Sequence, residues 1–307
     1  MKHRGHEGPI AEAGGHYAVV RASELPEVGV AQSWAQGLRE TSLVGAATGA
    51  AHLEIAIADL EPGGTVPGHV HPYEESFYVR EGEVLHRVAE RTYRLGPGDF
   101  GVAPIGTPHA WRNVGDRPAS WLQIRAPQPR PVGDSPRGIF EVPGFLVAEQ
   151  DAREPAESDP TNRFVGCFRE DQMPVPGPVA ARGVNAYNVR NVATRWMVDD
   201  TIGATHHIVF RGLMIAPPVQ PPPGHYHAFE EVYHVLGGDV EAYLNDDVHR
   251  VGPGDTVFAG VNAVHGFLPL GDEPMRWIET MSPRPPERDS MLFPRQWEPL
   301  KGMDRDR

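Results

Sequence analysis

Two histidines, a glutamate and a later histidine recur in the same arrangement at two places in the chain. The first set is His69, His71, Glu75 and His109, and the second is His225, His227, Glu231 and His265. Neutral imidazoles and a carboxylate are ligands for divalent first-row transition metals. Each set therefore predicts one metal site. Four protein ligands on an ion that accepts six leave two positions open, which points to catalysis, because a structural zinc site is closed.

A β-strand followed by a hairpin return would position each set. Successive side chains of a strand point to opposite faces, so residues 69, 71 and 75 would share one face. Aromatic residues of the same parity should line the cavity: Tyr73, Phe77 and Trp111 in the first repeat, and Phe229, Tyr233 and Phe267 in the second. An aromatic pocket suits a planar or hydrophobic organic substrate. The alternative, that these rings only fill the interior, stays equally open.

The two sets belong to a larger internal duplication. Residues 223–283 align with residues 67–127 at a constant offset of 156 without a gap, and about a third of the aligned positions are identical. Strong turn signals repeat with the sets, since Gly96-Pro97-Gly98-Asp99 corresponds to Gly252-Pro253-Gly254-Asp255. Alternation of apolar and other residues, as in residues 52–58, predicts half-buried strands. The chain therefore holds two small β domains of the same design.

Composition and charge narrow the possible partners. The 34 glycines and 32 prolines among 307 residues suit short strands joined by tight turns. A formal net charge of −13 disfavours nucleic acid and anionic membranes as partners, and the apolar runs are too short to span a bilayer. Cys167 is the only cysteine, which excludes an internal disulfide. With no apolar segment behind the basic start, we expect no signal peptide and a cytoplasmic protein.

The first repeat resembles the paired motifs of the cupin superfamily. The matching residues are Gly63, His69, His71, Glu75 and Gly82, then Gly98, Pro104, Gly106, His109 and Asn113. The second repeat keeps its ligand set, Gly238 and Gly254, but has Val219, Gly260, Asn262 and Pro269 at the other motif positions. The resemblance implies an all-β bicupin with two double-stranded β-helix (jelly-roll) barrels of the quercetin dioxygenase-like type, each with a metal in its mouth. Pairing into a homodimer is an expectation at the level of the family.

The repeats suggest a division of the chain into five parts. We expect an N-terminal arm with room for an added strand at 1–41, a first barrel at 42–130, a partly packed linker at 131–197, a second barrel at 198–283 and a tail at 284–307.

Three functions fit these observations. The first is a dioxygenase like the quercetin or gentisate dioxygenases among similar bicupins, acting with dioxygen on a small aromatic or enolisable organic substrate. The second is a non-oxidative metal-dependent isomerase, decarboxylase or aminohydrolase, and the third is a binding or storage protein. Two intact ligand sets disfavour the third. Fe(II) is the favoured ion, while Mn, Ni, Co, Cu and Zn stay open. A dianion such as oxalate would need an arginine, for which Arg125 is the basic candidate.

Residues outside the ligand sets are given simpler roles. Glu74 and Glu230 have the opposite parity to the ligands, so we expect them in solvent. Expected structural side chains are His86, His207, His234, His249, Trp121 and Trp277, and expected sheet or surface histidines are His52 and His206. If only one site is catalytic, the first is favoured, because its turns follow the full motif.

Overall fold

The computed structural model describes residues 15–156, 164–176, 191–216 and 224–286, and the regular secondary structure in these ranges is almost entirely β-strand. The first strands are β1 (Tyr17–Val20), β2 (Val30–Ala31), β3 (Gln36–Val44), β4 (Glu54–Val70), β5 (Glu74–Glu81), β6 (Val84–Val88), β7 (Arg91–Leu95), β8 (Asp99–Ala103), β9 (His109–Arg112) and β10 (Ala119–Ala126). Those that follow are β11 (Phe140–Glu141), β12 (Ala152–Arg153), β13 (Val165–Cys167), β14 (Val192–Val198), β15 (Ile208–Met214), β16 (Glu230–Gly237), β17 (Asp239–Leu244), β18 (Asp247–Val251), β19 (Thr256–Ala259), β20 (His265–Leu270) and β21 (Met275–Ser282). Four single 3-10 turns accompany them: η2 (Ala22–Glu24), η3 (Ala46–Thr48), η4 (Glu149–Asp151) and η5 (Glu170–Gln172). Within these ranges, no helix is both long and apolar enough to cross a membrane.

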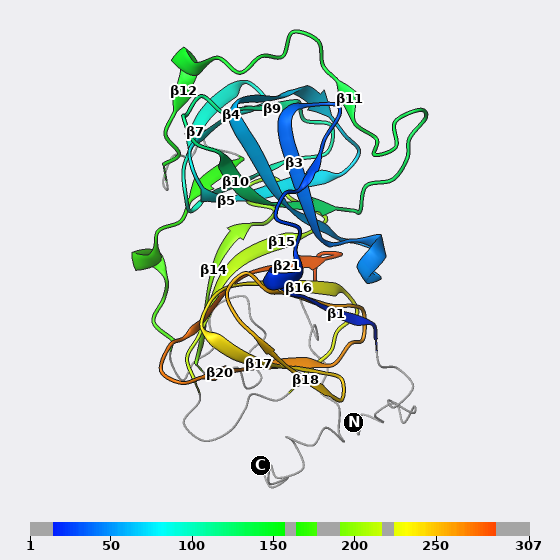
Figure 1. The fold of residues 1–307 in the computed structure, drawn as a ribbon, viewed down its shortest axis with the longest axis vertical. Coiled ribbons are helices and arrows are strands. Elements are labelled where there is room, and N and C mark those ends of the chain that lie inside the picture. The colour runs from blue at the N-terminus through cyan, green and yellow to red at the C-terminus, as the bar shows by residue number, and fades with distance from the viewer. Residues whose placement is uncertain (1–14, 157–163, 177–190, 217–223, 287–307) are drawn as a thin grey trace, which may run out of the picture.

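Two curled β-barrels lie one above the other (Figure 1). The first barrel is built on a sheet in the order β12-β7-β6-β9-β4-β10-β5-β8-β13, to which β2, β3 and β11 are joined. The second combines the sheet β1-β19-β16-β21-β15-β14 with the sheet β18-β17-β20. The predicted all-β architecture with two barrels is thereby confirmed.

The long strand β4 serves both halves of the first barrel. Its early residues pair with β10, and its late residues pair with β9. Gly63, between these stretches, has a φ of +73°, which L side chains rarely adopt. This turn within one strand carries the end of β4 to the mouth of the barrel, where the first ligand histidine lies.

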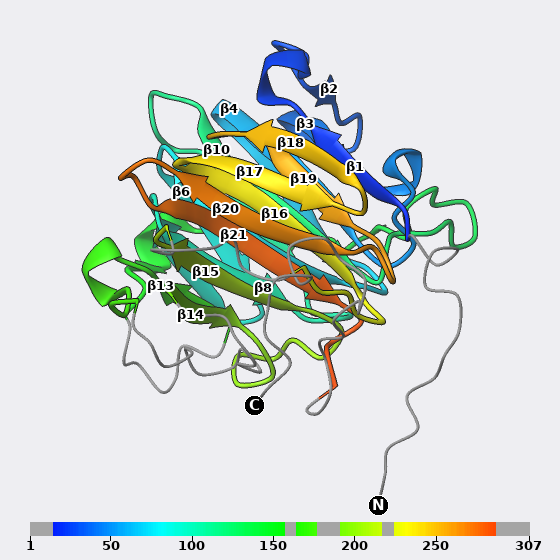
Figure 2. The same cartoon turned by 90° about the horizontal axis from the view of Figure 1, so that it is seen from below.

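The barrels exchange strands. The N-terminal β1 pairs with β19 of the second barrel, and β13, from the connection between the barrels, pairs with β8 of the first. Figure 2 shows β1 lying along β19. An arginine after each strand binds an aspartate of the other barrel: Arg21 lies 3.1 Å from Asp255, and Arg169 lies 3.0 Å from Asp99. The duplication therefore includes a leading strand before each barrel.

A shared hydrophobic core joins the two barrels. It combines Leu122, Ile124 and Val102 of the first barrel with Val209, Val232, Phe258 and Ile278 of the second. All eight residues of β10 are buried, because one face of this strand lines its own barrel and the other face meets the second barrel. Burying each large apolar side chain stabilises the assembly by about 1.5–3 kcal/mol.

The expectation that Glu74 and Glu230 are solvated is wrong, because the second barrel covers the outer face of β5 and the first covers that of β16. Glu74 is 1% exposed and Glu230 is 3% exposed. Glu230 accepts hydrogen bonds from the backbone N–H groups of three consecutive residues of the first domain, Ala51, His52 and Leu53, at 2.6–3.0 Å.

Glu74 accepts backbone hydrogen bonds from Thr205 at 2.6 Å and His206 at 3.0 Å, both in the second domain. The imidazole of His207 lies between Glu74, at 2.8 Å, and the Ser76 hydroxyl, at 2.7 Å. Each barrel thus contributes one buried glutamate that accepts hydrogen bonds from backbone N–H groups in a loop of the other barrel. Parity correctly separates these glutamates from the ligand face but does not reveal what covers them.

Candidate metal centres

The first ligand set gathers at the mouth of the first barrel. His69 lies next to the last residue of β4, His71 lies in the turn to β5, Glu75 lies on β5 and His109 begins β9. One ligand atom from each residue lies within 4.8 Å of the others. His71 Nε2 lies 3.2 Å from His109 Nε2 and 3.8 Å from Glu75 Oε2, and His109 Nε2 lies 3.5 Å from Glu75 Oε1. All four residues are buried.

Backbone carbonyls orient the three imidazoles. The Nδ1 atoms lie 2.8 Å from the carbonyl oxygen of Pro67 for His69, 2.7 Å from that of Tyr73 for His71, and 2.9 Å from that of Thr107 for His109. A carbonyl only accepts, so each Nδ1 donates and each Nε2 keeps its lone pair for a metal. Burial, with the neighbouring His109, lowers the pKa of His71 to about 4 and holds that of His69 well below its usual range. His69 and His71 are therefore neutral, as metal binding requires.

A buried arginine holds the carboxylate of the first set. Arg125, directly opposite Glu75 on β10, donates from Nε to Glu75 Oε2 at 2.9 Å and from Nη1 to Glu54 at 2.8 Å. Its third nitrogen donates to Glu40, and Arg137 binds Glu54 from the linker. Burial acts to raise the pKa of Glu75, but the Arg125 guanidinium together with His109 and His71 outweighs burial and holds the pKa well below its usual range.

The structure therefore places Arg125 beside the first ligand set but commits each of its three nitrogens to a carboxylate. Its position agrees with the sequence, whereas a role in binding a substrate anion would require it to leave a buried network. The effect of the network is to fix one oxygen of Glu75 and leave the other, Oε1, facing the histidines.

The second ligand set gathers in the same way in the second barrel. The ligand atoms of His225, His227, Glu231 and His265 lie within 4.8 Å of one another. Nδ1 of His227 lies 2.8 Å from the Phe229 carbonyl oxygen, and Nδ1 of His265 lies 3.0 Å from that of Ala263. Glu231 Oε2 lies between the Nε2 atoms of His227, at 2.6 Å, and His265, at 2.9 Å.

The surroundings of the two carboxylates differ. Met281 pairs with Glu231 and Ile208 in the second barrel, as Arg125 pairs with Glu75 and Glu54 in the first. An apolar cluster of Ile208, Phe210, Phe229 and Met281 therefore replaces the charged network. Glu279 lies against Glu231 instead, and burial together with the Glu231 charge raises the pKa of Glu279 well above its usual range.

The predicted pocket aromatics are all buried. Tyr73 stacks on His71 at 3.9 Å between ring centroids, and Phe229 stacks on His227 at 3.7 Å. Phe77 and Trp111 pack in the core of the first barrel, and Tyr233 and Phe267 pack in the core of the second. The rings of Tyr73 and Phe229 thus stack on ligand imidazoles, while the other four pack deeper in the barrel interiors.

Both donor sets have the residue types of a transition-metal site, and the spacing of the first set also fits one bound ion. Two ligands on one ion with bonds of about 2.1 Å lie about 3–4 Å apart, and the separations of 3.2, 3.5 and 3.8 Å in the first set fall in that range. Three neutral nitrogens and one carboxylate oxygen suit Fe, Mn, Co, Ni, Cu or Zn. The first set would hold an ion through His69, His71, Glu75 and His109, and the second through its equivalents.

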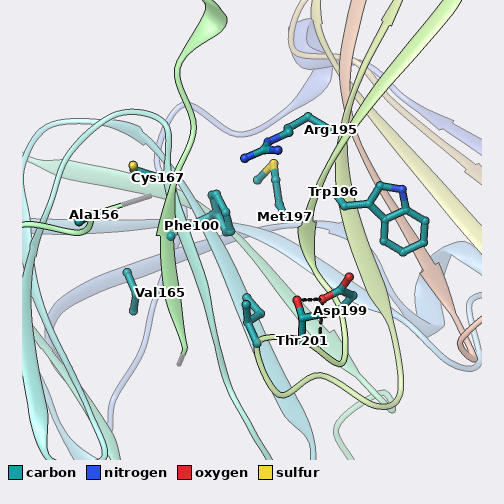
Figure 3. A pocket seen from close by; sticks show the side chains of 11 residues that line it. Phe100, Ala156, Val165, Cys167, Arg195, Trp196, Met197, Asp199 and Thr201 are labelled. Atoms are coloured by element: carbon teal, nitrogen blue, oxygen red, sulfur yellow. Dashed lines mark hydrogen bonds between the residues drawn. The ribbon is translucent and has the colours of Figure 1, made fainter. Parts of the chain in front are cut away.

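A separate pocket of about 240 Å³ lies between β8, β13 and β14 (Figure 3). Its lining includes Phe100, Cys167, Arg195, Met197 and Asp199, and none of the eight candidate metal ligands. The pocket therefore lies outside both ligand sets.

Comparison with known proteins agrees with this arrangement. The family model described as "Cupin domain" matches residues 56–125 and again residues 212–281. Each matched range contains all four residues of one ligand set. A protein named polyketide synthase CurC, from Streptomyces cyaneus, is 34% identical over 93 residues. That alignment covers 29% of this chain and 60% of the CurC protein, so the chain spans less than two thirds of this relative.

Solved structures share the two-barrel fold. A salicylate 1,2-dioxygenase from Pseudaminobacter salicylatoxidans superposes with a TM-score of 0.62 at 18% identity, covering 91% of this chain and 87% of that one. An oxalate decarboxylase from Lactobacillus farciminis has a TM-score of 0.57 at 15% identity, covering 90% and 88%. The Escherichia coli protein Ylba has a TM-score of 0.58 at 13% identity, covering 88% and 91%. With two matches to the family model and two barrels of this fold, the chain belongs to the cupin family and is a bicupin.

Proposed function

We propose that the protein is a metal-dependent dioxygenase whose first site acts on a small aromatic or enolisable organic substrate. His69, His71, Glu75 and His109 hold the ion of that site, Fe(II) by preference, and His225, His227, Glu231 and His265 hold a second ion. The observation that supports the proposal is the set of three imidazoles oriented by backbone carbonyls beside one carboxylate that is already fixed by Arg125. A divalent ion held there supplies positive charge and electrons for chemistry with dioxygen.

The charges around the first site favour a singly charged substrate. Three carboxylates, the buried Glu75 and the half-buried Glu40 and Glu54, face two guanidiniums, Arg125 and Arg137, which leaves one net negative charge. A divalent cation turns this balance into one net positive charge. A phenolate or an enolate would neutralise it, whereas a dicarboxylate would leave an uncompensated negative charge in a buried site.

The polyketide synthase relative supports the same class of substrate. Polyketide chains contain 1,3-dicarbonyl groups, which enolise, and their cyclised products are often phenols, so the similarity to a polyketide synthase protein fits an enolisable or phenolic substrate. One of the proteins of similar fold is a salicylate dioxygenase, which shows that two barrels of this kind can support oxygen chemistry.

Oxygen uptake tests the proposal. Protein loaded with Fe(II) without oxygen is mixed with air-saturated buffer and a panel of phenols and 1,3-diketones, and dioxygen and substrate are followed together. We expect stoichiometric loss of both with at least one member. His71→Ala should abolish uptake, and the matched variant His227→Ala should retain it. Substrate loss that continues unchanged without dioxygen would overturn the dioxygenase proposal. It would support the alternative, a non-oxidative isomerase, decarboxylase or aminohydrolase.

A further inference from the structure

The interior of the first barrel contains buried polar atoms without a hydrogen-bond partner in the described part of the chain. They are Tyr73 Oη, His86 Nε2, Trp111 Nε1, Trp121 Nε1 and Gln123 Oε1, together with Trp34 Nε1 at the mouth. Buried polar atoms in proteins are nearly always paired. A concentration of unpaired ones in a single barrel indicates a place where a bound molecule supplies the missing partners.

These atoms lie next to the first ligand set. His86 faces Trp111 across the β6–β9 pair, two residues along from the pair that contains His109. The ring centroids of His86 and Trp111 are 3.8 Å apart, and those of Trp111 and Trp121 are 4.5 Å apart. Gln123 occupies the inward position of β10 between Trp121 and Arg125, because side chains two residues apart share a face. The unpaired atoms of His86, Trp111, Trp121 and Gln123 therefore occupy the layer of the barrel next to the ligand set.

Their hydrogen-bonding roles can be assigned. The Nδ1 atom of His86 lies 3.2 Å from the Ala110 carbonyl oxygen, so Nδ1 donates and Nε2 is left as an acceptor. The carbonyl oxygen of Gln123 is a second acceptor, and the indole N–H groups of Trp111 and Trp121 are donors. This set can bind hydroxyl and keto groups but offers no cation, because Arg125 is already shared among three carboxylates.

The second barrel lacks these unpaired groups at the equivalent positions. Ala242 and Phe267 form the strand pair that corresponds to His86 and Trp111. Trp277 corresponds to Trp121, and its Nε1 donates to Glu279 Oε2 at 2.6 Å. The contrast shows that the unpaired atoms are a property of the first barrel and not of the repeated fold.

We propose that the layer formed by His86, Trp111, Trp121 and Gln123 is a subsite that selects hydroxy- or keto-bearing planar molecules without a carboxylate. His86 and Gln123 accept from hydroxyl groups of the ligand, and Trp111 donates to one of its oxygens. A carboxylate carried in addition to the phenolate or enolate at the metal is excluded, because this second negative charge would be buried without a cation. This subsite deepens the proposed function, since it defines the substrate class at the first site.

Binding to the zinc-loaded protein tests the subsite without any oxygen chemistry. Catechol is titrated by calorimetry in parallel with 2,3-dihydroxybenzoate, which adds one carboxylate to the same ring. We expect one catechol per chain and binding of the benzoate that is weaker by about tenfold or more, because a buried unpaired charge is strongly disfavoured. Equal or tighter binding of 2,3-dihydroxybenzoate would overturn the proposal, as would two equivalent catechol sites per chain.

Matched tryptophan variants test the assignment of the donor. Trp111→Phe removes an N–H group that has no partner in the protein, so it should leave the unfolding temperature nearly unchanged while weakening catechol by about fivefold. Trp277→Phe breaks the bond to Glu279, so it should lower the unfolding temperature and leave catechol affinity unchanged. Unchanged affinity in Trp111→Phe would overturn the assignment.

A histidine variant keeps the test decisive if Trp111→Phe does not fold. His86→Phe keeps a stacked ring but removes the acceptor, and catechol should again bind about fivefold more weakly. Catechol affinity equal to that of the unmodified protein would refute the subsite. If the binding pattern holds but the Fe(II) protein consumes no dioxygen, the proposed reaction fails and the subsite stands. If the Fe(II) protein consumes dioxygen but its catechol affinity does not change in the His86 and Trp111 variants, the subsite fails and the proposed reaction stands.

Discussion

Replacement of Glu74 by glutamine should weaken the attachment between the two barrels. The change keeps the size of the side chain but removes a charge that lies between the Thr205 and His206 amides and the His207 imidazole. It also turns one acceptor oxygen into an NH₂ group that would face backbone donors. The free energy of unfolding should therefore fall, mainly through loss of charge-assisted hydrogen bonds.

The pKa of Glu74 gives the size of the effect. Burial acts to raise this pKa, but hydrogen bonds from His207 and Thr205 outweigh burial and lower it from 4.5 to about 2. At about 1.4 kcal/mol per pKa unit this corresponds to about 3 kcal/mol, or about 2 kcal/mol after an allowance for solvent screening. Because the folded-state pKa is lowered, the contribution is complete above pH 4.5 and is lost as the pH falls toward 2.

Urea unfolding of metal-saturated protein, followed by tryptophan fluorescence between pH 8 and pH 3.5, measures the difference. We expect Glu74→Gln to cost about 2 kcal/mol from pH 8 to pH 5 and less at lower pH. The exposed Glu61→Gln serves as a control and should cost less than about 0.5 kcal/mol. A cost for Glu74→Gln no larger than that of the control, or a cost that grows as the pH falls, would refute the reasoning.

Further outcomes follow from the two metal centres. His71→Ala should lower bound metal from two ions per chain to one, and elemental analysis that still finds two would contradict the ligand assignment. Arg125→Met, which introduces the residue found opposite Glu231, should lower the free energy of unfolding by about 3–5 kcal/mol, because Glu40 and Glu75 lose their guanidinium partner. Denaturant unfolding measures this loss, and a cost near zero would exclude a structural role for the network. Chelation should destabilise the folded protein by about 2.7 kcal/mol per site for metal that had been present at about 100 times its dissociation constant, and an unchanged unfolding temperature would show that the sites do not hold metal tightly.

The ligand sets were accessible from the sequence because each depends on local rules. Residues 69, 71 and 75 share the parity of one strand face, and the repeat at residues 225–231 makes chance an unsatisfactory explanation. The turns at Gly98 and Gly254, both with positive φ, are similarly recognisable by residue type. The cupin family and the two-barrel fold follow from these features.

Contacts between the two barrels could not be predicted from the sequence by such local rules. Parity places Glu74 on the outer face of β5, but only the arrangement of the two domains shows that the second barrel covers it. The network around Arg125 likewise joins residues from β3, β4, β5 and β10, which no local pattern relates.

One signal of the strand exchange was present in the sequence and was missed. Arg21, Leu25 and Pro26 have the same spacing as Arg169, Met173 and Pro174, and each motif follows an exchanged strand. The second motif lies 148 residues after the first, whereas the barrels are offset by 156. The two motifs therefore do not line up when the barrels are aligned.

The exchanged strands also govern the order in which the molecule can be completed. Tyr17 pairs with Ala259, so β1 leaves the ribosome long before its partner exists, and the first barrel must wait for β13 before the edge of β8 is covered. Neither barrel is finished by its own stretch of polypeptide. A chain shortened to end after β10 would display a bare strand edge on which other chains could add, so aggregation rather than an independently folded half is its expected fate.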